Sequence, residues 1–178
     1  MYKISMLCKR VFDIFFLLVA LIVLSPIFLI LPVIIKLDSK GTVFFKQNRR
    51  GLNGRIFTMY KFRSMTQDAE QSGAGIFNYK GDPRITRVGQ IIRNTSLDEL
   101  PQLVNVLKGD MSLVGPRPCV TYELGDFNSL NKKYRKRFQA IPGITGLAQV
   151  SGRNNISWEK KVELDNEYID KFVKWGIF

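Results

Sequence analysis

A long uncharged hydrophobic run dominates the first forty residues. No charged residue occurs between Ile14 and Ile35, and a helix of that length matches the roughly 30 Å hydrocarbon core of a membrane. Basic residues flank the run on both sides: Lys3, Lys9 and Arg10 before it, and Lys36, Lys40, Lys46, Arg49 and Arg50 after it. Positive charge at both ends does not fit the positive-inside rule for a single crossing.

Ser25-Pro26 interrupts this run near its middle. Proline removes a backbone hydrogen bond and kinks a helix, and the Ser25 hydroxyl can bond to a carbonyl that the kink frees. Pro32 predicts a second break near the exit. We therefore predict a re-entrant helical hairpin that enters one leaflet and returns to the cytoplasmic face. Residues 1–40 would form this hairpin with its flanks, and residues 41–178 a cytoplasmic domain.

The remainder of the chain alternates strand and helix patterns. Two segments rich in β-branched and aromatic residues, 42–46 and 55–61, flank the turn signal Asn53-Gly54 and predict a β-hairpin. Helical spacing of apolar residues predicts three helices, over 85–93, 96–108 and 158–175. Residues 66–82 are polar and predict a loop or a weak helix. We predict an α/β (mixed α+β) fold in a single compact domain, preceded by the membrane hairpin.

Composition narrows the possible chemistry. The chain has 27 Lys and Arg against 15 Asp and Glu, a net charge of +12, and no histidine. The surplus indicates anionic partners or serves solubility alone. Without histidine, nucleophiles, bases and metal ligands must come from other side chains. Cys8 and Cys119 do not have metal-ligand spacing, and we expect both to be reduced thiols.

Two adjacent carboxylates, Asp98 and Glu99, are the first candidate for chemistry. Such a pair can bind Mg²⁺ or attack phosphorus. Ser96 and Glu99 also match a capping box, which explains both acids without catalysis. In either case we expect the carboxylates at a helix N-terminus, where the dipole favours negative charge and incoming phosphate. Neighbouring helical residues point about 100° apart, so the two acids can divide their roles.

Pro116-Arg117-Pro118 is the second candidate. Proline on both sides fixes the backbone around Arg117, and a rigidly held guanidinium can bind a phosphate. The alternative is a rigid turn that exposes an arginine. A basic cluster over residues 132–137 is typical of a solvated helix face and can also contact lipid phosphates.

Several longer motifs occur in a fixed order. They are the segments 61–65 (Lys-Phe-Arg-Ser-Met), 96–103 (Ser-Leu-Asp-Glu-Leu-Pro-Gln-Leu), 105–112, 115–118, 142–146 and 149–154. Together they closely resemble the bacterial sugar transferase family, the monotopic polyprenyl-phosphate phosphoglycosyl transferases similar to the enzyme of the Campylobacter protein-glycosylation pathway. The resemblance extends from Lys9 to about Lys171.

This resemblance implies an enzyme of the first membrane step of glycan assembly, in glycoprotein, capsule, exopolysaccharide or O-antigen pathways. It would move a sugar 1-phosphate from a UDP-sugar to polyprenyl (undecaprenyl) phosphate and release UMP, by a ping-pong mechanism. The resemblance makes Asp98 the nucleophile that forms a phosphosugar-aspartyl intermediate, and it makes Glu99 its companion at a Mg²⁺ site. Residues 41–178 would then be the catalytic domain.

The resemblance also assigns binding roles. Lys61, Arg93 and Arg117 match substrate phosphate-binding positions, Arg153 and Asp165 match nucleotide-sugar positions, and Ser25-Pro26 matches the break in the family's membrane helix. It implies a monotopic protein on the cytoplasmic face of the bacterial inner membrane, with anionic lipids but not nucleic acid as partners. Two alternatives stay open, a Mg²⁺-dependent membrane phosphohydrolase and a basic membrane-anchored binding module. Neither the sugar nor an oligomeric state is encoded in a recognisable motif.

Overall fold

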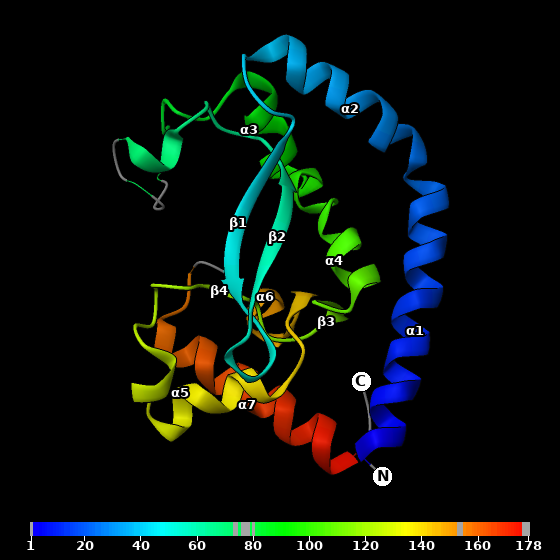
Figure 1. Ribbon diagram of the computed structural model, residues 1–178, viewed down its shortest axis with the longest axis vertical. Coiled ribbons are helices and arrows are strands. Elements are labelled where there is room, and N and C mark those ends of the chain that lie inside the picture. Colours follow the sequence, from blue (N-terminus) through cyan, green and yellow to red (C-terminus); the bar gives the residue numbers. More distant parts are fainter. Residues whose placement is uncertain (1, 73–74, 76–78, 80, 153–154, 176–178) are drawn as a thin grey trace. The chain divides into compact units, whose positions relative to one another are not determined.

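The computed structural model describes residues 2–72, 75, 79, 81–152 and 155–175 (Figure 1). Its helices are α1 (Tyr2–Val23), α2 (Ser25–Asp38), α3 (Arg87–Asn94), α4 (Gln102–Lys108), α5 (Lys132–Lys136), α6 (Leu147–Val150) and α7 (Trp158–Trp175). Its strands are β1 (Phe44–Arg50), β2 (Ile56–Phe62), β3 (Ser112–Val114), β4 (Cys119–Val120) and β5 (Gly143–Thr145). Short 3₁₀ turns include η3 (Leu97–Glu99) and η5 (Arg137–Gln139). The predicted mixed α/β fold class is confirmed.

The chain divides into two compact units. Unit 1 contains Met1–Val19, Gln47–Met59 and Gln102–Phe178, and unit 2 contains Ala20–Lys46 and Tyr60–Pro101. The predicted division into residues 1–40 and 41–178 stays a prediction.

The long hairpin of β1 and β2, coloured cyan in Figure 1, turns where the sequence predicts. Asn53 and Gly54 both have positive φ, 52° and 80°, which is the conformation that an Asn-Gly turn favours. β1 also pairs with β4 in antiparallel register, Arg49 opposite Val120, so the sheet has the order β2-β1-β4. This extra partner explains why β1 continues beyond the predicted end at residue 46.

A second, two-stranded sheet in unit 1 pairs β3 with β5 in parallel, with Ser112 opposite Gly143. The two backbones come unusually close because glycine, which has no side chain, stands just after β3 and at the start of β5. A Cβ on Gly115 would clash with the Ile141 carbonyl, and a Cβ on Gly143 would clash with the Gly115 amide. This contact fixes the chain at the point where it enters Pro116-Arg117-Pro118.

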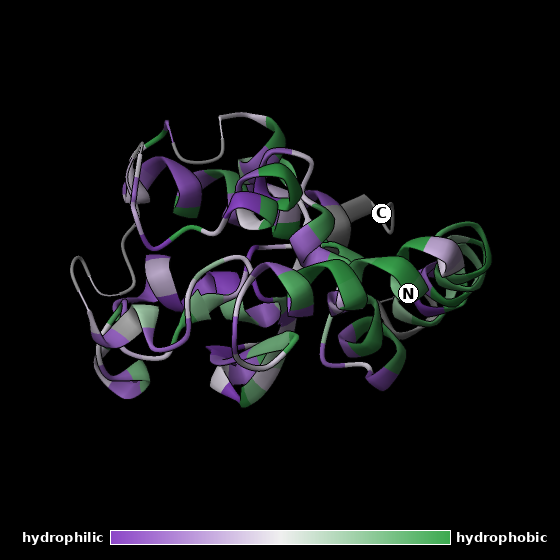
Figure 2. Cartoon of the chain, turned by 90° about the horizontal axis from the view of Figure 1, so that it is seen from above, coloured by the Kyte–Doolittle hydropathy of each residue, from purple (hydrophilic) through white to green (hydrophobic). Residues whose placement is uncertain are grey.

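Helices α1 and α2 form a bent pair. Between Met6–Val23 and Ser25–Asp38 the helix axis turns by 61°, and no single helix of the described residues is long and apolar enough to cross a membrane, whereas the pair together is. At the bend, the Ser25 hydroxyl donates to the Ile22 carbonyl at 2.8 Å. The helix nearest the N-terminus is mostly hydrophobic in Figure 2. Helix α2 continues through Pro32, so the predicted second break is wrong.

In unit 1, one face of α1 is buried, and it carries both charged and apolar side chains. Lys9, Asp13 and Leu17 recur every four residues and are buried, as helical periodicity requires for one face. Asp13 accepts hydrogen bonds from the Ser112 hydroxyl at 2.7 Å and from the Leu113 amide at 3.1 Å, and Lys9 lies 3.7 Å from its carboxylate.

Arg10 completes the attachment of α1 to the rest of unit 1. Its guanidinium donates to the carbonyls of Val106 at 2.6 Å and Leu107 at 2.9 Å. Both carbonyls belong to the last turn of α4, where backbone acceptors have no partner within the helix. The arginine therefore caps α4 and compensates the negative end of its dipole.

The apolar core of unit 2 joins α2 to β2 and α3. Leu31 and Ile35 of α2 are buried against Phe62 and Ile92. Arg63, which follows Phe62, is 5% exposed and donates to the carbonyls of Ser39 and Lys40, both at 2.6 Å. A buried guanidinium thus satisfies the chain end of α2, so α2 is an integral part of unit 2 and not a detached anchor.

Candidate active site

The acid pair lies in unit 2 on a 3₁₀ turn, not on the α-helix predicted from residue 96. Ser96 has φ 58° and makes no side-chain cap bond, so the predicted capping box is wrong. The turn closes through bonds from the Glu99 amide to the Ser96 carbonyl and from the Leu100 amide to the Leu97 carbonyl. Pro101 has no N–H to continue an α-helical ladder, which explains why α4 begins only at Gln102.

Left-handed backbone is costly at a serine, by about 1–2 kcal/mol. Ser96 adopts it two residues before Asp98. Strain of this kind persists where the surrounding structure enforces it, and it is concentrated at functional sites. At Ser96 it directs the chain into the turn that carries both carboxylates.

Lys61 faces the acid pair. Its Nζ lies 2.9 Å from Glu99 Oε1 and 3.9 Å from Asp98 Oδ2. Asp98 and Glu99 are each only 8% exposed. Two neighbouring carboxylates repel each other strongly when shielded from water, and a cation between them offsets that repulsion. Phe62, buried in the core, holds the end of β2 in place, so Lys61 is anchored by the residue beside it.

Arg93 lies on α3, in unit 2 with the acid pair. Helix α3 packs against η3, and Gly89 allows α3 to touch the chain at Ser64, whose carbonyl a Cβ would strike. One turn later on the same face, Arg93 Nη1 donates to the Ser64 hydroxyl at 3.4 Å. α3 begins at Arg87, two residues later than predicted, because the Thr86 hydroxyl caps the Gly89 amide at 2.9 Å.

Sequence reasoning missed the buried Asp82 and Arg84. Arg84 donates to the Asp82 carboxylate at 2.7–3.2 Å and to the carbonyls of Ala69, Ser72 and Gly75, each at 2.7 Å. The Arg84 hydrogen bond, assisted by the charge of Arg93, lowers the pKa of Asp82. These bonds hold the segment after Met65, through Ala69, Ser72 and Gly75, against Arg84. Asp-Pro-Arg is not a motif that predicts a buried ion pair, so the pair is identified only in the structure.

Unit 1 contains the other predicted residues. Arg117 is half-buried, and Asp165 is 1% exposed with its Oδ2 2.9 Å from Arg137 Nη2. Burial raises the pKa of Asp165, and the charge of Arg137 opposes that rise. Arg153 lies outside the described residues. Lys61, Arg93, Asp98 and Glu99 are thus gathered in unit 2, whereas Arg117 and Asp165 belong to unit 1.

The basic cluster of α5 is largely neutralised by α7. Lys133 pairs with Glu163 at 3.2 Å and Lys136 with Asp170 at 2.6 Å, and Arg135 lies over the Phe127 ring at 4.8 Å. These contacts favour the interpretation of a solvated helix face over that of a lipid-binding patch.

The chemistry of the two carboxylates is compatible with the predicted Mg²⁺ site, in which substrate would supply further ligands. Within the described ranges there is no group of three or more Asp, Glu, Cys or His that could hold a metal alone. Mg²⁺ characteristically takes one or two protein carboxylates and fills its octahedron with water and substrate phosphates. A carboxylate offers about four lone-pair positions, so an ion pair between Glu99 and Lys61 is compatible with that arrangement.

Comparison with known proteins gives a consistent result. The sequence model of a family described as bacterial sugar transferase matches residues 4–176. An uncharacterized sugar transferase of Bacillus subtilis is 47% identical over 97% of this chain and 81% of its own length. The UDP-N-acetylgalactosamine-undecaprenyl-phosphate N-acetylgalactosaminephosphotransferase of Aeromonas hydrophila is 46% identical over 94% of this chain and 40% of its own. The undecaprenyl-phosphate galactose phosphotransferase of Salmonella typhimurium is 42% identical over 97% of this chain and 38% of its own.

Proposed function

This chain belongs to the bacterial sugar transferase family, and we propose that it transfers a sugar 1-phosphate from a UDP-sugar to undecaprenyl phosphate with release of UMP. The observation that carries the proposal is the acid pair Asp98-Glu99, shielded from solvent with Lys61 at 2.9 Å and 3.9 Å. The names of the Aeromonas and Salmonella relatives support the lipid acceptor. The chain spans only about two fifths of those two relatives, so their activities enter here as part of the proposal.

In the first step, an oxygen of the Asp98 carboxylate forms a bond to the β-phosphorus of the UDP-sugar. The bond between that phosphorus and the bridging oxygen breaks, and UMP leaves with the electron pair. In the second step, a phosphate oxygen of undecaprenyl phosphate attacks the same phosphorus and the aspartyl oxygen leaves. Covalent catalysis of this kind replaces one difficult transfer between two substrates with two easier displacements.

The residues around Asp98 contribute in different ways. Lys61 stabilises the negative charge that accumulates on the phosphoryl oxygens, as Arg93 and Arg117 would from their own positions. Glu99 and Asp98 would hold Mg²⁺, which when bound supplies Lewis-acid stabilisation of the diphosphate. Burial of the acid pair excludes water, which would otherwise hydrolyse a phosphosugar ester.

Mass spectrometry of the protein incubated with individual UDP-sugars and Mg²⁺ tests this proposal. We expect an adduct on Asp98 with the mass of one sugar phosphate, formed together with one equivalent of UMP. Undecaprenyl phosphate should discharge it. A phosphohydrolase would instead release sugar phosphate at its full rate without the lipid, and a binding module would release no UMP from any UDP-sugar. The pair of relatives above name different sugars, so the panel should include galactose and N-acetylgalactosamine donors.

We also propose that the bent α1–α2 pair enters one leaflet from the cytoplasmic face of the inner membrane. Outward-facing side chains on both helices are large and apolar, among them Leu7, Val11, Ile22, Leu29 and Leu37. Anionic lipids would favour the exposed Lys36 and Lys40 near the end of α2.

Membrane-impermeant thiol labelling of single cysteines checks this topology. Cysteines placed within residues 1–10 and within 40–50, in a Cys8→Ser background, should react from the same side of sealed inverted vesicles. Pro26→Ala permits one more backbone hydrogen bond at the bend; we expect it to straighten the pair and to move one of the two sites to the opposite side in a fraction of molecules. Opposite-side labelling of the unmutated protein would exclude the hairpin.

A further inference from the structure

The Pro116-Arg117-Pro118 segment is held through all three of its carbonyl groups. The Pro116 carbonyl accepts from the Gly143 amide at 2.9 Å. The Arg117 carbonyl accepts from Arg137 Nη2 at 2.8 Å, and the Pro118 carbonyl accepts from Arg49 Nη1 at 3.2 Å. Two of these three donors are arginine side chains, so the segment's placement depends on residues distant in the sequence.

Arg137 is itself held by a carboxylate and by two aromatic rings. It is 4% exposed, and its Nη2 lies 2.9 Å from Asp165 Oδ2. Its guanidinium carbon lies 5.0 Å from the centre of the Trp158 ring and 5.8 Å from that of Phe138. Aromatic faces on a guanidinium and a carboxylate at its edge leave the group little freedom to rotate.

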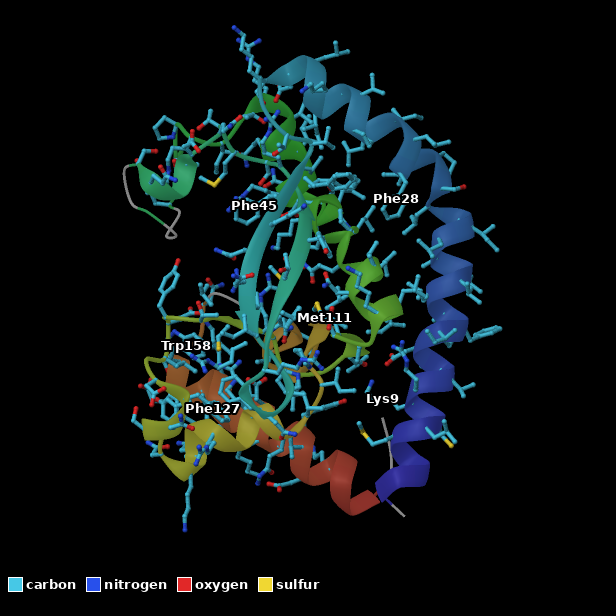
Figure 3. The ribbon with its side chains drawn as sticks, viewed as in Figure 1. Lys9, Phe28, Phe45, Met111, Phe127 and Trp158 are labelled. Atoms are coloured by element: carbon cyan, nitrogen blue, oxygen red, sulfur yellow. The ribbon has the colours of Figure 1, made fainter. Side chains whose placement is uncertain are left out.

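Helix α7 supplies two of these contacts from one face. Trp158 and Asp165 are seven residues apart, two helical turns, so they project in the same direction. Helix α7 packs against η5, which carries Arg137, and Figure 3 shows Trp158 at the α7 side of unit 1. The order of contacts is therefore from α7 to Arg137 and from Arg137 to the backbone of Arg117.

We propose that Asp165 and Arg137 are positioning residues that set the backbone of Arg117, and that Asp165 does not itself contact the nucleotide sugar. The proposal rests on the proposed function, in which the Arg117 side chain binds a substrate phosphate. Asp165 is 1% exposed and engaged with Arg137, whereas a side chain that recognises substrate needs to present polar atoms to it. A displacement of about 1 Å in a phosphate-binding group can lower a rate roughly 100-fold.

A double-mutant cycle on the first half-reaction tests this inference. The variants are Asp165→Asn, Arg117→Ala and the pair, with UMP release measured in a single turnover. We expect Arg117→Ala to lower the rate roughly 100- to 1,000-fold and Asp165→Asn to lower it roughly 10- to 100-fold. Because both would act through one guanidinium, the pair should be no slower than Arg117→Ala alone. Glu167→Gln, an exposed acid on the same helix, is the matched control and should leave the rate unchanged.

Arg137→Lys provides a second arm that keeps the buried positive charge beside Asp165. We expect it to lower the rate in the otherwise unmutated protein and to have no further effect beside Arg117→Ala. Thermal unfolding midpoints show whether each variant is folded; if Asp165→Asn is not, Arg137→Lys decides the question alone.

Three results would overturn the inference. Multiplicative losses in the double variant would mean that Asp165 acts independently of Arg117. The same conclusion would follow if Asp165→Asn raised the KM for UDP-sugar by the same factor in the unmutated protein and in Arg117→Ala. Full activity of Arg117→Ala would remove the group through which Asp165 is proposed to act, while the transferase function would stand on the Asp98 adduct. An unmutated protein that released no UMP would remove both.

Discussion

Replacing Asp98 by asparagine is expected to abolish the phosphosugar adduct and to slow UMP release on the order of 10⁴-fold or more, the loss typical of removing a covalent nucleophile. The amide has nearly the shape of the carboxylate but no anionic oxygen to attack phosphorus. Removal of one negative charge beside Glu99 and Lys61 relieves repulsion, so the variant should remain folded. Mass spectrometry and single-turnover UMP release measure the two effects.

Asp170→Asn is the matched control for this prediction. Asp170 is exposed on α7 and pairs with Lys136 at the surface, where such pairs contribute about 0–1 kcal/mol, so activity should not change. An Asp98→Asn protein that still loaded undecaprenyl phosphate at the original rate would eliminate the aspartyl intermediate. Glu99→Gln should behave differently, with a reduced rate that rises again at high Mg²⁺ concentration.

Replacing Lys61 by methionine is expected to lower the rate of UMP release roughly 100- to 1,000-fold, the effect of removing one well-placed group that stabilises developing charge. Methionine keeps the apolar stem but removes the positive charge that lies 2.9 Å from Glu99 and 3.9 Å from Asp98. Lys61→Arg should recover part of the activity because it restores the charge with a different geometry. Single-turnover kinetics at saturating UDP-sugar measure the change.

Lys171→Met is the control here, since Lys171 is exposed and pairs with Glu167 within one helix. Equal losses in Lys61→Met and Lys61→Arg would show that a specific amine geometry is required rather than charge. An unchanged rate in Lys61→Met would contradict the assignment of Lys61 to the site.

The sequence was most informative where local rules decide the structure. Asn53-Gly54 predicts the hairpin turn because its backbone preference is intrinsic, and the bend between α1 and α2 lies at Ser25-Pro26. Pro32 shows the limit of the same rule. Proline alone predicted a break there, yet the helix continues, since Leu31 and Ile35 on either side are buried in the core of unit 2.

The residue motif at 96–99 shows a second limit. It has the letters of a capping box, but Pro101 prevents the helix that such a box would begin, and Ser96 takes a left-handed conformation instead. Contacts between residues distant in the chain could not be predicted from the sequence either. Nothing in the sequence pairs Arg137 with Asp165, or Arg84 with three carbonyls of the loop before it, because these contacts depend on tertiary packing.

The attachment of α1 has a practical consequence for anyone who wishes to handle this protein without detergent. Deleting the first two dozen residues removes α1 and the first half of the hydrophobic stretch, but it also takes away Arg10 and Asp13. The last turn of α4 would then lose its guanidinium donors, and the Ser112 hydroxyl would lose its shorter bond, to Asp13. A shortened polypeptide would expose less apolar surface, but it would lose these internal hydrogen bonds. Water-soluble forms are better sought by exchanging outward-facing apolar side chains such as Val11 and Ile22 for polar ones.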